Sequence, residues 1–344
     1  MGKKAVVIKG DGIGPETVNS MLKVLSDCGF SSEIIELEAG SEQWDKNGRK
    51  DPTYIPDITM NALESSDACF KGPTTTIPSQ NAPRSVAVTL RQKFELYSNI
   101  RPCKTFERLT PNRSLDCVCF REATEGLYSG EEVMTSPDSA IAIRKITRKG
   151  CKRFAQASAH WAEEHDMKKM VAITKRNILK MTDGIFLEEM QKAADTVPGL
   201  NLSEIYIDNM AQQMIVATEQ FNGAVLASTN LFMDIISELA SGLIGSIGLI
   251  YSANMGDKFA MFEAAHGSAP SLTGKNIANP TATILSSAWM AEYLGEKHVR
   301  DAIFDATWQI INEGKYVTSD IGGNATTTQM ANAISDIACK HLKK

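Results

Sequence analysis

Short apolar runs alternate with longer amphipathic stretches along most of this chain. The first apolar run, from Ala5 to Ile8, precedes a stretch with helical spacing of its apolar residues that begins near Pro15 and ends near Gly29. Proline is typical of the first turn of a helix, and glycine is typical of the position just past its end. The sequence therefore predicts a strand followed by a helix at the start of the chain.

Similar strand-like runs recur between helical stretches. They lie at residues 68–72, 116–120, 170–174, 204–208 and 223–228. Strands that alternate with helices predict an α/β fold whose sheet is largely parallel. From Ala278 onward the pattern is almost entirely helical, and the sequence contains no repeat, low-complexity linker or proline-rich hinge.

The composition narrows the class of protein. With 344 residues the chain suits two lobes or one large α/β domain. Its 36 Lys and Arg residues against 41 Asp and Glu give a net charge of -5 without a basic arm, which argues against a nucleic-acid partner. The apolar window from Gly242 is too short and too interrupted by Gly and Ser to span a bilayer, so we expect a core segment and no membrane association.

The cysteines indicate a reducing compartment. They number seven and are scattered, and none forms a CxxC pair. Cys117 and Cys119 share a strand-like run, where we expect reduced, mostly buried thiols and no zinc site. The first residues, MGKKAVVIKG, contain no long apolar leader-like region, so we expect a cytoplasmic protein.

A glycine-rich turn, Gly10-Asp11-Gly12-Ile13-Gly14, joins the first strand to the first helix. A dinucleotide fingerprint GxGxxG that starts at Gly10 or Gly12 would need glycine where Pro15 or Thr17 stands. The spacing therefore predicts a tight turn and not a Rossmann domain.

Three arginines, Arg91, Arg101 and Arg121, occur in one stretch together with Tyr128. Guanidinium groups are rigid forks of donors that match carboxylates, so arginines that converge near a phenol predict a pocket for a small polycarboxylate. The alternative for each arginine alone is a solvated ion pair with a nearby glutamate.

Acidic residues suggest a metal site. Asp234 and Glu238 are four residues apart in a helical stretch and so share one face, and Asp208 ends an earlier strand-like run. Carboxylate oxygens suit Mg²⁺ or Mn²⁺. The alternative is a solvated acidic pair, although the flanking residues are apolar.

Two further segments contain candidate polar groups. Lys175 and Asn177 directly follow the run at 170–174, at the strand end where parallel sheets hold ligands, and a lysine there can act as a base. The alternative is a surface lysine at a strand end. His266 lies in a loop rich in Gly, Pro, Ser and Asn that can wrap a cofactor with backbone groups.

Together these segments resemble the β-decarboxylating hydroxyacid dehydrogenases, the family of isocitrate, 3-isopropylmalate and homoisocitrate dehydrogenases. The resemblance covers nearly the whole chain through the following motifs: GDGIGPE, KGP, LRQ..ELYSNIRP, RE.TEGLYSG, K.NI.K..DG, IDN, NL..DI.S, FEAAHGSAP, NPTA and TSDIGG.ATT. It implies an α/β isocitrate/isopropylmalate dehydrogenase-like fold, with a mixed sheet, helices on both sides and no Rossmann domain. It also implies a large domain of residues 1–96 plus 246–344 and a small domain of residues 97–245 that forms a homodimer.

The resemblance implies roles for individual residues. Tyr128 would be the proton donor, and Lys175 of the neighbouring subunit would handle the proton of the substrate hydroxyl. Asp208, also from the neighbour, would join Asp234 and Glu238 around Mg²⁺ or Mn²⁺. The substrate would contact Ser85, Arg91, Arg101, Arg121 and Asn177. The cofactor would contact Thr75, Glu263, His266, Gly267, Ser271, Asn279 and Asp320.

The chain departs from the family pattern at three positions. Glu238 stands where the family has a second helical aspartate, Met233 where it has glycine, and Ala123 where it has asparagine. These departures keep open the alternative of a non-catalytic regulatory homologue.

Two choices within the family rest on short segments. Isocitrate enzymes typically have the pattern Ser-x-Asn before the first arginine. This chain keeps the serine as Ser85 but has Ala87 in place of the asparagine. The homoisocitrate pattern would need a basic residue at the position of Val88. We expect isocitrate, with 3-isopropylmalate and homoisocitrate as alternatives. Ser271 and Leu272 offer no positive charge to a 2′-phosphate, so we expect NAD, with NADP as the alternative.

Overall fold

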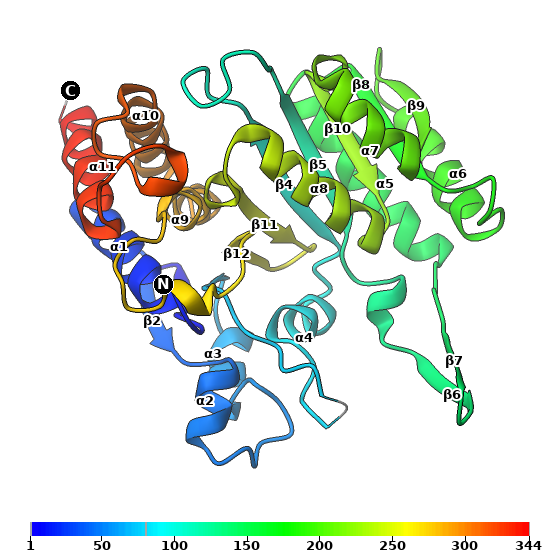
Figure 1. The fold of residues 1–344 in the computed structure, drawn as a ribbon, viewed down its shortest axis with the longest axis horizontal. Coiled ribbons are helices and arrows are strands. Elements are labelled where there is room, and N and C mark those ends of the chain that lie inside the picture. Colours follow the sequence, from blue (N-terminus) through cyan, green and yellow to red (C-terminus); the bar gives the residue numbers. More distant parts are fainter. Residues whose placement is uncertain (1, 80, 344) are drawn as a thin grey trace.

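The computed structural model describes residues 2–79 and 81–343. Its main feature is a ten-stranded sheet that crosses the whole molecule (Figure 1). In their order across the sheet, the strands are β2 (Glu33–Leu37), β1 (Lys4–Ile8), β3 (Ala68–Lys71), β12 (Ala260–Ala264), β11 (Tyr251–Met255), β4 (Ser98–Lys104), β5 (Asp116–Glu122), β10 (Ala224–Ser228), β8 (Lys169–Thr174) and β9 (Asn201–Tyr206).

The sheet is mixed. Strands β2, β1, β3 and β12 are parallel to one another, and so are β5, β10, β8 and β9. Between these two sets, β11 is antiparallel to both β12 and β4, and β4 is antiparallel to β5. The two parallel sets therefore run in opposite directions. This architecture confirms the predicted mixed α/β sheet and differs from a Rossmann domain.

Helices cover both faces of the sheet. One face carries α1 (Gly14–Asp27), α5 (Arg148–Glu164), α6 (Thr182–Ala194), α9 (Thr281–Tyr293), α10 (Lys297–Glu313) and α11 (Thr327–Leu342). The other face carries α2 (Ser41–Lys46), α3 (Asp57–Glu64), α4 (Val86–Lys93), α7 (Ile207–Val216) and α8 (Asn230–Ile244). Short 3-10 turns are η1 (Leu127–Ser129), η2 (Thr218–Phe221), η3 (Ile247–Leu249), η4 (Pro270–Leu272) and η5 (Ser319–Ile321).

Alternation along the strands builds separate core layers in the first parallel set. In β1, Ala5 and Val7 join the larger apolar cluster, whereas Val6 and Ile8 join a smaller one under α2 to α4. Successive side chains of a strand point to opposite faces, so a strand buried on both faces is apolar throughout. This explains the unbroken apolar run that marks the first strand in the sequence.

The start of the chain folds as predicted. Helix α1 has Pro15 in its first turn, and Gly29 just beyond its end has a φ of 77°. In the preceding turn Gly12 has a φ of 63°, and a Cβ there would lie 2.1 Å from the carbonyl oxygen of Ser268. The glycine is needed for this close backbone approach and for its positive φ.

One predicted element ends earlier than expected. Strand β9 stops at Tyr206, and Asp208 lies in the first turn of α7 and not at a strand end. An acidic residue is favourable there because the first turn of a helix carries a partial positive charge. No helix among the described residues is long and apolar enough to cross a membrane.

A two-stranded ribbon, β6 (Glu132–Ser136) and β7 (Ser139–Ala142), projects from the body of the molecule (Figure 1). All of its strand residues are exposed, including Val133, Met134 and Ile141. An isolated two-stranded hairpin is only marginally stable in water. Clustered apolar side chains that are exposed on a protein surface indicate an interaction surface. The ribbon therefore presents such a surface.

Candidate active site

The three arginines lie on one face of the sheet and are buried, with 3–5% of their surface exposed. Arg101 and Arg121 come from β4 and β5, and Asn99 of β4 is paired in register with Arg121 on one side and Asn254 of β11 on the other. Because residues two apart in a strand share a face, these polar residues form a row across the sheet. Helix α8 packs over this row.

Two asparagines connect the arginines. Arg101 donates from Nε to Oδ1 of Asn99 at 2.8 Å, and Asn99 donates to Oδ1 of Asn254 at 3.0 Å. Arg91 of α4 donates from Nε to the same Asn254 oxygen at 2.8 Å. Sequence reasoning missed both asparagines. Their signal was a polar amide inside a mostly buried strand, since buried amides are retained where they have partners.

Tyr128 and Arg121 meet at Asp234 of α8. The Arg121 guanidinium pairs with one carboxylate oxygen of Asp234, and the Tyr128 hydroxyl donates to the other at 2.5 Å. The guanidinium also lies 4.9 Å from the centre of the Tyr128 ring, and its Nε donates to Asn230 at 2.7 Å. The structure thus brings together the predicted proton donor, one predicted arginine and one predicted metal ligand.

The cluster brings the positive charges of three buried arginines close together. Burial, and then repulsion from Arg91 and Arg101, lowers the pKa of Arg121 to about 10. Arg91 already pairs with Glu263, and Arg101 and Arg121 share Asp234 and Glu238 on α8. A buried site that concentrates guanidinium groups is suited to an anion with several carboxylates. Burial, and then the hydrogen bond to Asp234, raises the pKa of Tyr128, which keeps its hydroxyl protonated.

Asp234 and Glu238 supply two carboxylates from one face of α8. Their side chains are 29% and 46% exposed, and Arg101 lies 3.4 Å from Glu238. Burial raises the pKa of Glu238, and the positive charge of Arg101 opposes this rise. Half-exposed oxygens of this kind fit Mg²⁺ or Mn²⁺. The described residues of one chain contain no cluster of three or more His, Cys, Asp or Glu that could hold a metal, so a metal site on this pair would be incomplete within one chain.

Lys175 and Asp208 form a separate pair. The Lys175 ammonium lies 2.7 Å from Oδ1 of Asp208 and 5.7 Å from the centre of the Tyr206 ring. The hydrogen bond from Lys175 lowers the pKa of the exposed Asp208 carboxyl. Asn177 follows in the same exposed turn. Within the described residues no hydrogen bond or ion pair joins these side chains to the arginine cluster.

Glu263, predicted as a cofactor residue, lies in the polar row and not in a cofactor pocket. It is buried and pairs with Lys71 at 2.8 Å and with Arg91 at 2.9 Å. Burial opposes its charge, but the Lys71 and Arg91 cations outweigh this effect and lower the pKa of Glu263. These contacts indicate that Glu263 holds Arg91 in place.

A cavity of about 350 Å³ collects four other predicted cofactor residues: His266, Gly267, Asn279 and Asp320. Asp320 accepts hydrogen bonds from Asn279 at 2.9 Å and from Ser246 at 2.6 Å. Burial lowers the pKa of His266, which leaves a neutral imidazole. None of the lining residues is Lys or Arg, and Asp320 contributes a carboxylate, so the cavity does not favour a phosphate group.

The other two predicted cofactor residues lie beside this cavity without lining it. The Thr75 hydroxyl is 2.7 Å from that of Ser268, within the HGSAP loop, and its amide donates to the buried Asp11. Ser271 is exposed in η4, next to Leu272 of the cavity lining. Ser85 caps α4, where its Oγ accepts from the Val88 amide at 3.2 Å.

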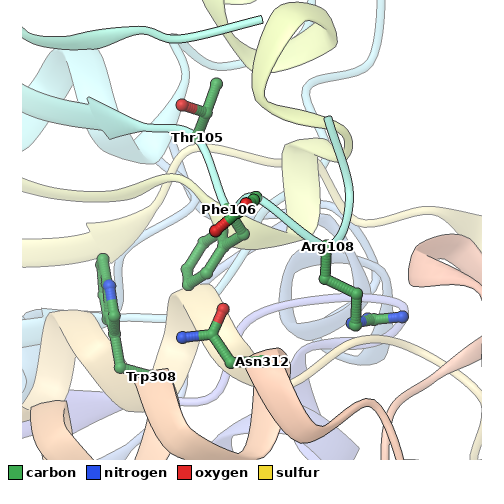
Figure 2. A pocket seen from close by; sticks show the side chains of 6 residues that line it. Thr105, Phe106, Arg108, Trp308 and Asn312 are labelled. Atoms are coloured by element: carbon green, nitrogen blue, oxygen red, sulfur yellow. The ribbon is translucent and has the colours of Figure 1, made fainter. Parts of the chain in front are cut away.

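A further cavity, of about 470 Å³, lies between the end of β4 and α10 (Figure 2). Its lining includes Phe106, Arg108 and Trp308 but none of the predicted site residues. The Arg108 guanidinium already has hydrogen-bond partners, because it donates to the carbonyls of Ile311 at 2.6 Å and Ile321 at 2.9 Å. We therefore do not regard this cavity as the active site.

The fold and site together define a class of protein. A non-Rossmann α/β sheet carries buried arginines, a protonated phenol and helical carboxylates, and a separate cavity without Lys or Arg is lined by the loop that contains His266. This combination suits a protein that binds a polycarboxylate.

Comparison with known proteins agrees. Residues 4–334 match the isocitrate/isopropylmalate dehydrogenase family. The chain is 39% identical over 343 residues to a 3-isopropylmalate dehydrogenase of Methanothermobacter thermautotrophicus, covering 99% of this chain and 98% of the relative. It is 38% identical over 336 residues to an isocitrate/homoisocitrate dehydrogenase of Thermus thermophilus, covering 97% and 98%. The crystal structure of isocitrate dehydrogenase from Methylococcus capsulatus superimposes with a TM-score of 0.92 at 39% identity, covering 98% and 99%.

The chain therefore belongs to the isocitrate/isopropylmalate dehydrogenase family of β-decarboxylating dehydrogenases. Proteins of this family depend in general on a divalent metal ion and on NAD or NADP, bind polycarboxylate substrates and are often homodimers. The predicted family is confirmed, and its relatives carry three different substrate names at similar identity.

Proposed function

We propose that this protein catalyses the metal-dependent oxidative decarboxylation of isocitrate to 2-oxoglutarate and CO₂, with NAD as the oxidant. The observation that carries the proposal is the convergence of Arg101, Arg121 and Tyr128 on the carboxylates of α8. Cations for the substrate carboxylates, a proton donor and two metal ligands thus occupy one half-buried site.

The arginines bind and orient the substrate in this proposal. Arg101 and Arg121 are held by Asn99 and Asn230, and Arg91 by Glu263 and Asn254, so their guanidinium groups are fixed before substrate arrives. Fixed donors cost little reorganisation when a charged substrate binds. Ser85 and Asn177 would complete the substrate contacts.

Two residues handle protons. Lys175 from the partner subunit takes the proton of the substrate hydroxyl during oxidation, and Tyr128 delivers a proton to the carbon that loses CO₂. The raised pKa of Tyr128 suits a group that must hold its proton until that step. When bound, the nicotinamide would accept hydride, and Mg²⁺ or Mn²⁺ on Asp234, Glu238 and the partner's Asp208 would polarise the oxidised carbonyl.

One feature supports isocitrate over isopropylmalate. Arg84 stands directly before Ser85, so the residues leading into α4 supply a cation and a hydroxyl and no acidic side chain. Ala87 and Val88, which lie on the same side of α4 as Arg91 and one turn earlier, are apolar and do not favour a third carboxylate. The Arg84 guanidinium donates to the side-chain oxygen of Gln92 and to the carbonyl of Ser129, but both partners are neutral. Its positive charge therefore favours a third carboxylate over an isopropyl group.

The second candidate is 3-isopropylmalate dehydrogenase, which is the name of a relative that is 39% identical over nearly the whole chain.

Reduction of the nicotinamide cofactor separates the candidates. The purified protein should be assayed with isocitrate, 3-isopropylmalate and homoisocitrate, each with NAD and with NADP, at saturating Mn²⁺. We expect turnover with isocitrate and NAD. A preference for 3-isopropylmalate would overturn the substrate, and a folded dimer inactive under every condition would indicate the regulatory homologue.

A further inference from the structure

Lys175 is anchored through its backbone. The Lys175 amide donates to Oδ2 of Asp183 at 2.6 Å, and its carbonyl accepts from the amides of Ile178 at 2.9 Å and Leu179 at 2.8 Å. Asp183 sits in the first turn of α6 and therefore ties the loop after β8 to the start of that helix. This contact fixes where the lysine side chain leaves the backbone.

Asp183 is buried beside Arg144. Asp183 is 1% exposed, and its other oxygen forms an ion pair with the Arg144 guanidinium at 2.8 Å. A buried carboxylate without a cation is strongly disfavoured, so loss of Arg144 would leave Asp183 uncompensated. Arg144 is itself held by the hydroxyls of Thr182 at 2.6 Å and Thr229 at 2.9 Å and lies 5.3 Å from the centre of the Phe232 ring.

The backbone anchor matters most when the metal site is complete. In the single chain the Lys175 ammonium pairs with Asp208, whose side chain is 67% exposed. Under the proposed function Asp208 binds a metal ion, so it would no longer pair with the Lys175 ammonium. The Asp183 contact is on the backbone and would persist. Small displacements of a reacting group reduce rates steeply, so this anchor controls the reach of Lys175.

Arg144 also lies at the root of the exposed ribbon. It follows β7 by two residues, just after the exposed Ile143. Arg144 therefore lies where the chain returns from the ribbon to the body of the molecule, beside the start of α6.

We propose that Arg144 and Asp183 form a positioning pair that holds Lys175 in its reactive place. The proposal rests on the role assigned to Lys175 under the proposed function. Neither residue contacts the arginine cluster among the described residues, so the pair acts through Lys175 and not on the substrate.

The test compares Arg144→Met, Arg144→Lys and the control Arg49→Met in the full-length dimer. Arg49 is an exposed arginine that pairs with Asp45, far from Lys175 in the chain. We expect Arg144→Met to lower kcat by about 10–100-fold, because a misplacement of about 1 Å costs up to about 100-fold, while KM for the acid changes less than about twofold. Arg144→Lys should restore most of kcat, and Arg49→Met should match the parent. Binding of the acid with Mn²⁺, measured by calorimetry, should be unchanged in all three variants.

The outcomes separate the two proposals. Wild-type kcat in Arg144→Met, or a loss that Arg144→Lys does not rescue, would overturn the positioning pair. Lys175→Met is measured beside it. If Lys175→Met is active, both the proposed role of Lys175 and the proposed positioning pair are wrong. If Lys175→Met is inactive and Arg144→Met is fully active, only the positioning pair is wrong. Should Arg144→Met fail to fold, Thr229→Val deletes one hydrogen bond to Arg144 and should lower kcat by about 3–10-fold at constant KM.

Discussion

Single residues set the charge of the proposed substrate site. Arg91, Arg101 and Arg121 are buried near one another, and their mutual repulsion is relieved by Glu263 and by the carboxylates of α8. Glu263 pairs with both Arg91 and Lys71. These three side chains therefore form a buried group of three charges. Such a group is strongly destabilised when one member is removed.

Replacing Glu263 by glutamine should therefore destabilise the protein. We expect a loss of about 3–5 kcal/mol in the free energy of unfolding at neutral pH, measured by urea denaturation. The folded-state pKa of Glu263 lies below its ordinary value of 4.5. The stabilisation is therefore fully present above that value and is lost as the pH falls further toward the folded-state pKa, so the variant and the parent should converge in acid.

Glu33→Gln is the matched control, because Glu33 pairs with Lys4 at 3.4 Å on the surface. An exposed pair contributes about 0–1 kcal/mol, and the control should therefore lie close to the parent. Equal unfolding free energies for Glu263→Gln and Glu33→Gln would contradict the structural importance of the buried group.

Elements decide which residues can act together. Helix α8 places Asp234 and Glu238 on one face, as their spacing of four residues predicted, and places that face over β4 and β5. Burial raises the pKa of Glu238 above its ordinary value of 4.5. Protons should therefore compete with a metal ion at Glu238 at a higher pH than at an ordinary glutamate.

This prediction concerns metal binding and can be checked without turnover. Mn²⁺ affinity, measured by electron paramagnetic resonance of the free ion, should fall as the pH is lowered toward the raised pKa of Glu238. Glu238→Gln should bind Mn²⁺ at least about tenfold more weakly and should lose most of this pH dependence. Glu313→Gln, an exposed change at the end of α10, should leave both properties intact. A Glu238→Gln protein with parental affinity would show that Glu238 is not a ligand.

At the scale of the whole molecule, no hydrogen bond or ion pair in the described part of one chain joins Lys175 or Asp208 to Tyr128 or Asp234. The exposed apolar ribbon and the incomplete metal ligand set both fit a dimer whose active sites take residues from two subunits. In a C₂ dimer each subunit would complete the site of the other.

Complementation between two inactive variants tests this arrangement. Tyr128→Phe and Lys175→Met homodimers should each be inactive in decarboxylation while still binding substrate. Subunits mixed by refolding in equal amounts should recover about a quarter of parental activity, because half of the dimers are hybrids and each hybrid has one intact site. Mixed samples that stay inactive, despite hybrids confirmed by native mass spectrometry, would place Tyr128 and Lys175 in the same subunit's site.

Much of the fold was predictable from local patterns. The strand near Ala5, the helix from Pro15 and the helical tail are all present, because alternation of apolar residues and glycine or proline punctuation act over short distances. The motif pattern also indicated the family, now confirmed, and excluded a Rossmann turn through Pro15 and Thr17. Local signals of this kind need no knowledge of distant residues.

Tertiary structure decided what those residues face. The opposite directions of the two parallel strand sets, the use of Asn99 and Asn254 as links between arginines, and the engagement of Glu263 with Lys71 depend on strands that are distant in sequence. The same holds for Asp208, which lies in a helix where the apolar pattern had predicted a strand end. Sequence by itself determined which side chains are available and which local elements form. Long-range packing determined which charges are buried together, because desolvation and pairing exist only once distant segments meet.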